Sequence, residues 1–193
     1  MDYDKYKVDI PEAQSGDWRV EKFTVSEEDA KLERIRAVFS FSNRGRGVPA
    51  GDYTRLCYNG AVVMSDTPDE IMDYRYFMNI ATGNVLINGL GLGVVLKGVL
   101  FKDSVEKVIV NEISEDVIRL VVPSIKDERV TINHADAFIW KPDDLRFNAV
   151  WHDIWDNICS DNLESMKCLH RKYGHYLQKP SYQGSWCRYL IER

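Results

Sequence analysis

Residues 84–100, "NVLINGLGLGVVLKGVL", place a short apolar run, a glycine-rich turn and a helix-compatible apolar run in succession. The glycines occupy alternate positions, at Gly89, Gly91 and Gly93. Glycines between a strand and a helix let the backbone approach a ligand and leave helix N-terminal amides exposed. A dinucleotide-binding turn would need glycine or alanine where the sequence has Val94. The spacing instead suits a smaller nucleoside with a carboxylate tail, although a tight strand–helix connection without a ligand gives the same pattern.

The alternation of strand and helix continues along the chain. The runs rich in valine and isoleucine are typical of strands in a sheet that is covered on both faces. The pattern predicts an α/β fold with a Rossmann-like, doubly wound, mostly parallel sheet, which binds ligands at the carboxyl ends of its strands. The further strands are expected at 107–112, 129–136 and 147–153, and the helices at 93–102, 114–125 and 162–174.

The N-terminal part has a different pattern. A polar segment leads to Ser26, which is expected to cap an amphipathic helix. Asn59 and Gly60 separate two β-prone runs, as in a type I′ hairpin, and a second helix follows the hairpin. We therefore expect an N-terminal helix and β-hairpin extension over 1–83 and a ligand-binding Rossmann-like domain over 84–193.

Composition and charge limit the classes of partner. The chain has 193 residues, of which 45% are hydrophobic and 28% charged, and its net charge is −5. That charge argues against nucleic acid as a partner, because nucleic acids require a basic face. The sequence has neither a membrane span nor a signal-peptide core, so we expect a cytoplasmic protein without a membrane partner.

The four cysteines lack metal-site spacing, so no metal is expected. The stretch "NRGRG" (43–47) is expected to be a solvated loop, with binding of an anionic substrate as the alternative.

Acidic residues stand at the ends of the predicted strands. Glu112 follows the glycine turn by about 20 residues, where an acid accepts hydrogen bonds from a ribose diol. The alternatives for Glu112 are a surface acid or a cap partner of the next helix, although Ser114 can fill the cap role. Asp136 ends the third strand and could accept a hydrogen bond from an adenine amine, with a turn aspartate as the alternative. Asp153 and Asp156 follow the fourth strand, and capping is the alternative for Asp156.

The set "INGLGLG", "VIVNEIS", "INHADAF" and "AVWHDIWD" resembles class I S-adenosylmethionine-dependent methyltransferase domains. Within that superfamily it is most similar to the spermidine synthases, which carry a small N-terminal β domain. Those proteins also have an Asp-x-x-Asp after the fourth strand, which Asp153 and Asp156 match in spacing. The resemblance covers residues 52–157 and implies S-adenosylmethionine as the cofactor.

The resemblance also implies roles for single residues. Asp153 would face the reacting group and, with Asp156, would orient or deprotonate the acceptor. Tyr74 and Trp155 are candidate substrate contacts, with packing as the alternative for Trp155. His152 is expected to point away from the Asp153 side because side chains alternate along a strand. The implied contacts to S-adenosylmethionine are Asn88, Gly89, Gly91, Gly93, Glu112, Ile113, Asp136, Ala137 and Asp153.

Two departures from the spermidine synthase pattern favour an ordinary methyl donor. The spermidine synthases carry an aspartate in the glycine turn, where it binds the aminopropyl amine, and Gly91 stands at that position here. We therefore expect the turn amides to be free to bind the donor carboxylate. We also expect the protein to bind S-adenosylmethionine more tightly than its decarboxylated form. After residue 174 the chain is too short for the usual fifth strand, helix and final antiparallel pair, which predicts a C-terminally shortened methyltransferase fold with a last helix over 183–193.

The sequence thus predicts an S-adenosylmethionine-binding, methyltransferase-like protein that transfers an alkyl group to a small acceptor. One alternative is a spermidine synthase-like aminopropyltransferase, and another is a non-catalytic nucleoside-binding or scaffold protein. A homo-oligomer is one way to cover the edge strand of a short sheet.

Overall fold

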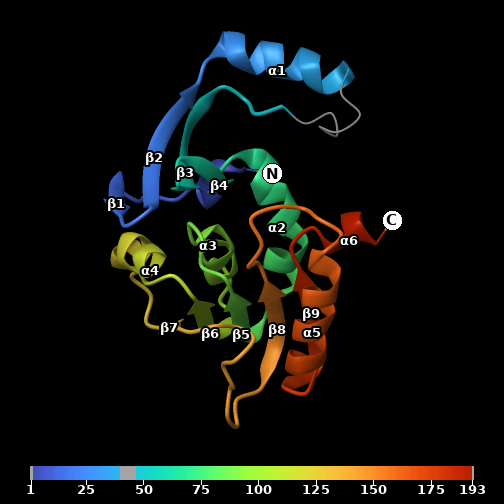
Figure 1. Ribbon diagram of the computed structural model, residues 1–193. Coiled ribbons are helices and arrows are strands. Elements are labelled where there is room, and N and C mark those ends of the chain that lie inside the picture. The colour runs from blue at the N-terminus through green and yellow to red at the C-terminus, as the bar shows by residue number, and fades with distance from the viewer. Residues whose placement is uncertain (1, 40–46, 193) are drawn as a thin grey trace.

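Figure 1 shows the computed structural model of the protein, which describes residues 2–39 and 47–192. A four-stranded antiparallel sheet, formed by N-terminal residues, lies over one end of a five-stranded parallel sheet. The parallel strands run toward the N-terminal sheet, so their carboxyl ends face it. Most of the basic stretch at 43–47 lies outside the described residues.

The parallel sheet has the strand order β7-β6-β5-β8-β9, and every neighbouring pair is parallel. Side chains alternate along β5, so Val85 and Ile87 pack in one buried cluster, whereas Leu86 packs on the opposite face with Leu169 and Tyr173. Both faces are therefore covered, and the predicted Rossmann-like α/β fold is confirmed. The elements are α2 (Pro68–Ile80), β5 (Gly83–Asn88), α3 (Val94–Leu100), β6 (Val105–Glu112), α4 (Glu115–Val121), the 3-10 turn η2 (Val122–Ser124), β7 (Val130–His134), β8 (Phe147–His152), α5 (Asn162–Gly174) and β9 (Leu177–Ser185).

Strand β9 corrects the expected end of the sheet. A fifth strand is present, parallel to β8, and only α6 (Arg188–Ile191) is helical within the helix expected over 183–193. The sequence of the strand, "LQKPSYQGS", has no apolar run because it lies at the edge of the sheet. An edge strand also tolerates Pro180, since one side of its backbone needs no ladder partner. Hydrophobic periodicity therefore gave no signal for it.

The N-terminal sheet has the order β1-β2-β3-β4. Asn59 and Gly60, with φ of 49° and 79°, join β3 and β4 in the predicted hairpin. Ser26 caps α1 (Glu27–Phe39) as expected, because its hydroxyl accepts the N–H of Asp29 at 3.1 Å. The polar segment expected before Ser26 instead contributes two strands, in which every residue except Val20 is exposed or half-buried, so they lack a clear apolar pattern. The four strands are β1 (Ala13–Ser15), β2 (Trp18–Val25), β3 (Gly51–Tyr58) and β4 (Ala61–Ser65), and a short 3-10 helix, η1 (Asp4–Tyr6), precedes them.

One continuous core links the two sheets. Val20 and Leu56 of the N-terminal sheet belong to the same buried cluster as Val85 of β5. A hydrogen bond from the Ser15 hydroxyl to the Asp116 carboxylate, at 2.6 Å, ties β1 to α4. These contacts fix the N-terminal sheet over the carboxyl ends of the parallel strands. Within the part of the chain that the structure describes, no helix combines the length and the apolar character needed to cross a membrane.

Candidate functional site

The glycine turn between β5 and α3 adopts left-handed backbone conformations, with φ of 97° at Gly89, 49° at Gly91 and 77° at Gly93. A side chain at Gly89 would also lack space, because its Cβ would lie 1.9 Å from the carbonyl oxygen of Asp153. Only glycine therefore lets the end of β8 come so close to the turn. Gly93 is the N-cap residue of α3.

Among the described residues, four of the five amides from Gly89 to Gly93 donate to acceptors inside the protein, and the exception is the N–H of Gly91. The Leu90 N–H donates to the Glu112 carboxylate at 2.8 Å, and the Leu92 N–H donates to the sulfur of Met64 at 3.1 Å. The expectation that the turn amides are free for a donor carboxylate is therefore wrong for these amides. The amides at the two ends donate to backbone carbonyls, Gly89 to Asn111 and Gly93 to Leu90, each at 2.8 Å.

Glu112 is buried, with 8% of its surface exposed, and it holds two backbone amides. One carboxylate oxygen accepts the Leu90 N–H and the other accepts the Ser114 N–H, both at 2.8 Å. The carboxylate thus joins the glycine turn to the start of α4. Ser114 fills the cap role, because its hydroxyl accepts the Val117 N–H at 3.3 Å. Each carboxylate oxygen has further acceptor capacity, so Glu112 can still bind a hydroxyl group.

Asp136 follows β7 and has the contact of a turn aspartate. One of its oxygens accepts the Phe138 N–H at 2.7 Å, which fixes the turn after the strand. Ala137 is buried, and its carbonyl accepts the Tyr173 hydroxyl at 2.7 Å. Ile113, at the end of β6, has 66% of its surface exposed. This edge of the sheet therefore offers a carboxylate beside exposed apolar surface.

Asp153 follows β8, and its N–H donates to the carbonyl of Asn88 at 2.8 Å. Burial, followed by the negative charge of Glu70, raises the pKa of the Asp153 carboxyl to about 7. Burial likewise raises the pKa of Glu70 to about 7, although its carboxylate accepts the N–H and the hydroxyl of Ser65 at 2.9 and 2.6 Å. Burial and the charge of Asp153 raise the pKa of Tyr74 well above its ordinary value. Two carboxyl groups at this site therefore exchange protons near neutral pH.

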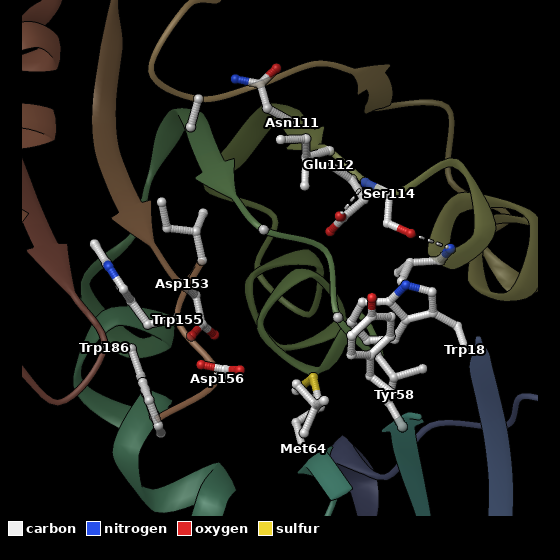
Figure 2. A pocket seen from close by; sticks show the side chains of 18 of the residues that line it. Trp18, Tyr58, Met64, Asn111, Glu112, Ser114, Asp153, Trp155, Asp156 and Trp186 are labelled. Atoms are coloured by element: carbon white, nitrogen blue, oxygen red, sulfur yellow. Dashed lines mark hydrogen bonds between the residues drawn. The ribbon is translucent and has the colours of Figure 1, made fainter. Parts of the chain in front are cut away.

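These groups line one cavity of about 470 Å³ at the carboxyl ends of the parallel strands. Figure 2 shows Glu112 on one wall and Asp153 and Asp156 on the opposite wall. Of the residues proposed from the sequence, Asn88 and Gly93 lie outside the lining. The others line it: Tyr74, Gly89, Gly91, Glu112, Ile113, Asp136, Ala137, Asp153, Trp155 and Asp156.

The charge of the cavity has one sign. Among its described lining residues none is Lys, Arg or His, and there are five carboxylates: Glu70, Glu112, Asp136, Asp153 and Asp156. Trp155 is fixed by donation of its indole N–H to the Ser165 hydroxyl at 2.9 Å. The indole N–H of Trp186 is buried without a partner among the described residues. Over the same residues, no three His, Cys, Asp or Glu side chains are grouped as a metal site. The cavity therefore favours a cationic ligand with apolar surface, and Trp186 offers that ligand a hydrogen-bond donor.

Asn88 faces the other side of the sheet. Its side chain accepts from Asn111 at 2.8 Å and lies 2.9 Å from the Nδ1 of His152, while Asn133 donates to Asn111 at 3.0 Å. These polar side chains form a row across four neighbouring strands, β7, β6, β5 and β8. The row lies on the face of the sheet that packs against α5, where the ring of His152 lies 5.4 Å from the ring of Tyr173. His152 points away from the Asp153 side, as expected, and burial holds its pKa well below the ordinary value.

The N-terminal sheet supplies one wall of the cavity, which the sequence did not predict. Trp18 of β2, Tyr58 of β3 and Met64 of β4 line the cavity, and their contribution depends on strand pairing. Glu70 could have been identified from the sequence. It stands four residues before Tyr74, so the two residues share one face of α2, and the other residues on that face are buried.

The fold is similar to that of spermidine synthases. The match with the crystal structure of spermidine synthase from Thermotoga maritima covers 91% of this chain and 55% of that chain, at 20% identity and a TM-score of 0.55. A spermidine synthase in complex with the transition state analogue AdoDATO matches over the same shares, 91% and 55%, at 20% identity and a TM-score of 0.57. The chain thus spans 55% of the length of these structures.

Methyltransferase structures match over a smaller part of the chain. The CcbJ methyltransferase from Streptomyces caelestis matches over 61% of this chain and 48% of its own, at 19% identity and a TM-score of 0.48. No protein-family model matches the sequence, and no curated protein matches it either. The spermidine synthase comparisons show the fold alone, a Rossmann-like methyltransferase fold joined to an N-terminal antiparallel sheet.

Proposed function

We propose that the protein binds an adenosyl sulfonium donor of the S-adenosylmethionine type and transfers an alkyl group from it to a small amine. The observation that carries the proposal is the charge of the cavity, which has five carboxylates and no Lys, Arg or His among its described lining residues. A sulfonium is a cation, and so is a protonated amine, so both are attracted to this cavity. The similarity to a spermidine synthase that holds AdoDATO adds support for an adenosyl ligand.

The wall formed by the ends of β6 and β7 is assigned to the adenosine half of the donor. Glu112 would accept the ribose hydroxyls with the lone pairs that the two backbone amides leave unused. The second oxygen of Asp136 would accept the adenine amine, and the exposed side chain of Ile113 would cover a face of the ring. Because one carboxylate would then fix both the glycine turn and the ribose, nucleoside binding would stabilise the turn.

Asp153 is assigned the role of base. The amine nitrogen attacks the carbon attached to the sulfonium, and the carbon–sulfur bond breaks with its electron pair kept by sulfur, which leaves a neutral thioether. Because a protonated amine has no free electron pair, its nitrogen must lose a proton before this attack, and a carboxylate with a pKa of about 7 accepts one at neutral pH. Asp156 is exposed at the same wall and would orient the charged far end of the acceptor. Tyr74 and Trp155 would border the acceptor chain.

An aminopropyl donor is the second candidate. A donor without a carboxylate needs no cationic partner, and the described lining residues include none. The bond changes are the same, with an aminopropyl group in place of a methyl group. A non-catalytic nucleoside-binding or scaffold protein is the alternative outside enzymes, and turnover separates it from both.

The test is turnover with each donor and a panel of diamines and polyamines. Mass spectrometry would follow S-adenosylhomocysteine and 5′-methylthioadenosine, and we expect one of them to form at a rate that depends on the amine. Asp153→Asn should lower that rate by about 100-fold or more, the usual contribution of a positioned base. Asp144→Asn, an exposed acid outside the cavity lining, is the matched control. Nucleoside binding without turnover would favour the non-catalytic alternative, and absence of binding would contradict the proposal.

A further inference from the structure

Met64 occupies the space beside the middle of the glycine turn. Its sulfur accepts the Leu92 N–H at 3.1 Å, and a Cβ on Gly91 would lie 2.2 Å from that sulfur. Figure 2 shows the thioether pointing from the N-terminal sheet toward the turn. The sulfur therefore lies against the backbone of Gly91, the position at which spermidine synthases carry an aspartate.

A β-bulge directs this side chain. Leu56 pairs with Met64, but the next residue, Cys57, pairs with Val62, so Val63 is an extra residue in β4. As a result the consecutive residues Val63 and Met64 both line the cavity, whereas a regular strand would send them to opposite faces. The register of the N-terminal sheet thus places a thioether at the turn.

The backbone next to Met64 is fixed as well. The N–H and the hydroxyl of Ser65 both donate to the Glu70 carboxylate, at 2.9 and 2.6 Å. Because Glu70 belongs to α2, these bonds tie the end of β4 to a helix that packs on the parallel sheet. Met64 is therefore part of a fixed wall.

We propose that Met64 determines the tail of the adenosyl donor, by disfavouring a tail with a carboxylate and accepting one without it. The inference rests on the proposed function. The two amides that flank Gly91 are taken, Leu92 by the thioether and Leu90 by Glu112. A thioether has no N–H to donate to a carboxylate, and the described lining residues include no cation.

The two kinds of donor tail would therefore differ in how favourably they bind beside Met64. A carboxylate at this place would lose water and would find only the N–H of Gly91 among the turn amides, so its hydrogen bonds to water would not be replaced in full, which is unfavourable. An aliphatic chain without a carboxylate would pack against the polarizable sulfur. The expected preference is therefore the reverse of the one that the sequence suggested.

Binding measurements with two donors isolate this effect. S-adenosylmethionine and its decarboxylated form differ only in the tail carboxylate, and without an acceptor neither is consumed. Calorimetry would compare the parent protein with Met64→Ala and with Val62→Ala, a matched control on the same strand whose side chain is 53% exposed. We expect the parent and the control to bind the decarboxylated form about tenfold or more tightly, as an unpaired buried carboxylate requires. Met64→Ala should reduce this ratio by about tenfold, because it frees the Leu92 amide.

A second variant keeps the test decisive if Met64→Ala does not fold. Met64→Gln has a similar length and a side-chain N–H that can donate to a carboxylate, so it should also shift the preference toward S-adenosylmethionine. Equal binding of the two donors by the parent, tighter binding of S-adenosylmethionine, or an unchanged ratio in a folded Met64 variant would overturn the inference and leave the proposed function standing. Binding of neither donor by the folded parent would remove the proposed function and the inference with it.

Discussion

Replacing Glu112 by alanine should damage the fold as well as the nucleoside site. If Glu112 were only the acceptor of the ribose hydroxyls, this change would weaken nucleoside binding and leave the fold intact. In the structure the carboxylate accepts the Leu90 and Ser114 amides, each at 2.8 Å, and Leu90 is 5% exposed. Glu112→Ala therefore leaves two backbone donors without their charged acceptor.

The expected loss follows from these two hydrogen bonds. A bond to a charged group contributes about 1.5–3 kcal/mol, and the Ser114 amide is closer to solvent and can recover part of its share from water. We expect the free energy of unfolding to fall by about 2–4 kcal/mol. For a chain of this size that corresponds to about 4–16 °C in Tm.

Thermal melting with three variants provides the assay. Glu112→Gln keeps one acceptor oxygen and should lose about half as much stability as Glu112→Ala. Glu115→Ala is the control, because this neighbouring acid is 58% exposed and forms a surface ion pair with Arg119. A Tm for Glu112→Ala within about 2 °C of the parent would refute the assignment of a structural role, given the size of a lost charged hydrogen bond.

Two further predictions concern Asp153. Because its folded pKa of about 7 lies above the ordinary value of 3.8, the folded state binds this proton more tightly, so its contribution to stability is present below about pH 4 and is lost as the pH rises through about 7. Melting between pH 5 and pH 8 should therefore show a steeper fall of Tm in the parent than in Asp153→Asn, and equal slopes would contradict the raised pKa. Gly89→Ala should lower the free energy of unfolding by more than about 2 kcal/mol, since its Cβ meets the Asp153 carbonyl at 1.9 Å and its φ is 97°. A melting curve like that of the parent would show that β8 and the turn can separate.

The parallel sheet was predictable because its signals are local. Strands such as β5 and β6 are buried on both faces and therefore read as continuous apolar runs. The alternate glycines mark the turn, and acids such as Glu112 and Asp153 stand where the strands end. Each of these features depends on a few neighbouring residues, so the parallel sheet and the end of it at which the cavity lies were predictable from the sequence.

The remaining parts depend on pairing between distant segments. Strands β1, β2 and β9 are short, polar or at an edge, so their periodicity is weak and only their partners define them. The bulge at Val63 is a property of register between β3 and β4, and it decides that Met64 reaches the turn. Asn88 shows the same limit, because the residue stands at the correct end of β5 but its side chain joins the polar row on the opposite face.

The acidic cavity also links ligand binding to stability. Glu70 and Asp153 each have a pKa of about 7, and neither has a Lys, Arg or His opposite it among the described lining residues. Ionisation of the pair above that pH therefore places repelling charges in a buried space, which lowers the stability of the ligand-free protein. A cation in the cavity would favour the ionised forms, lower both pKa values and recover that stability, so it should bind with release of protons near pH 7. A neutral or anionic ligand would gain nothing from this linkage, which is a physical reason to expect that the charge of the ligand, more than its shape, is what this site selects.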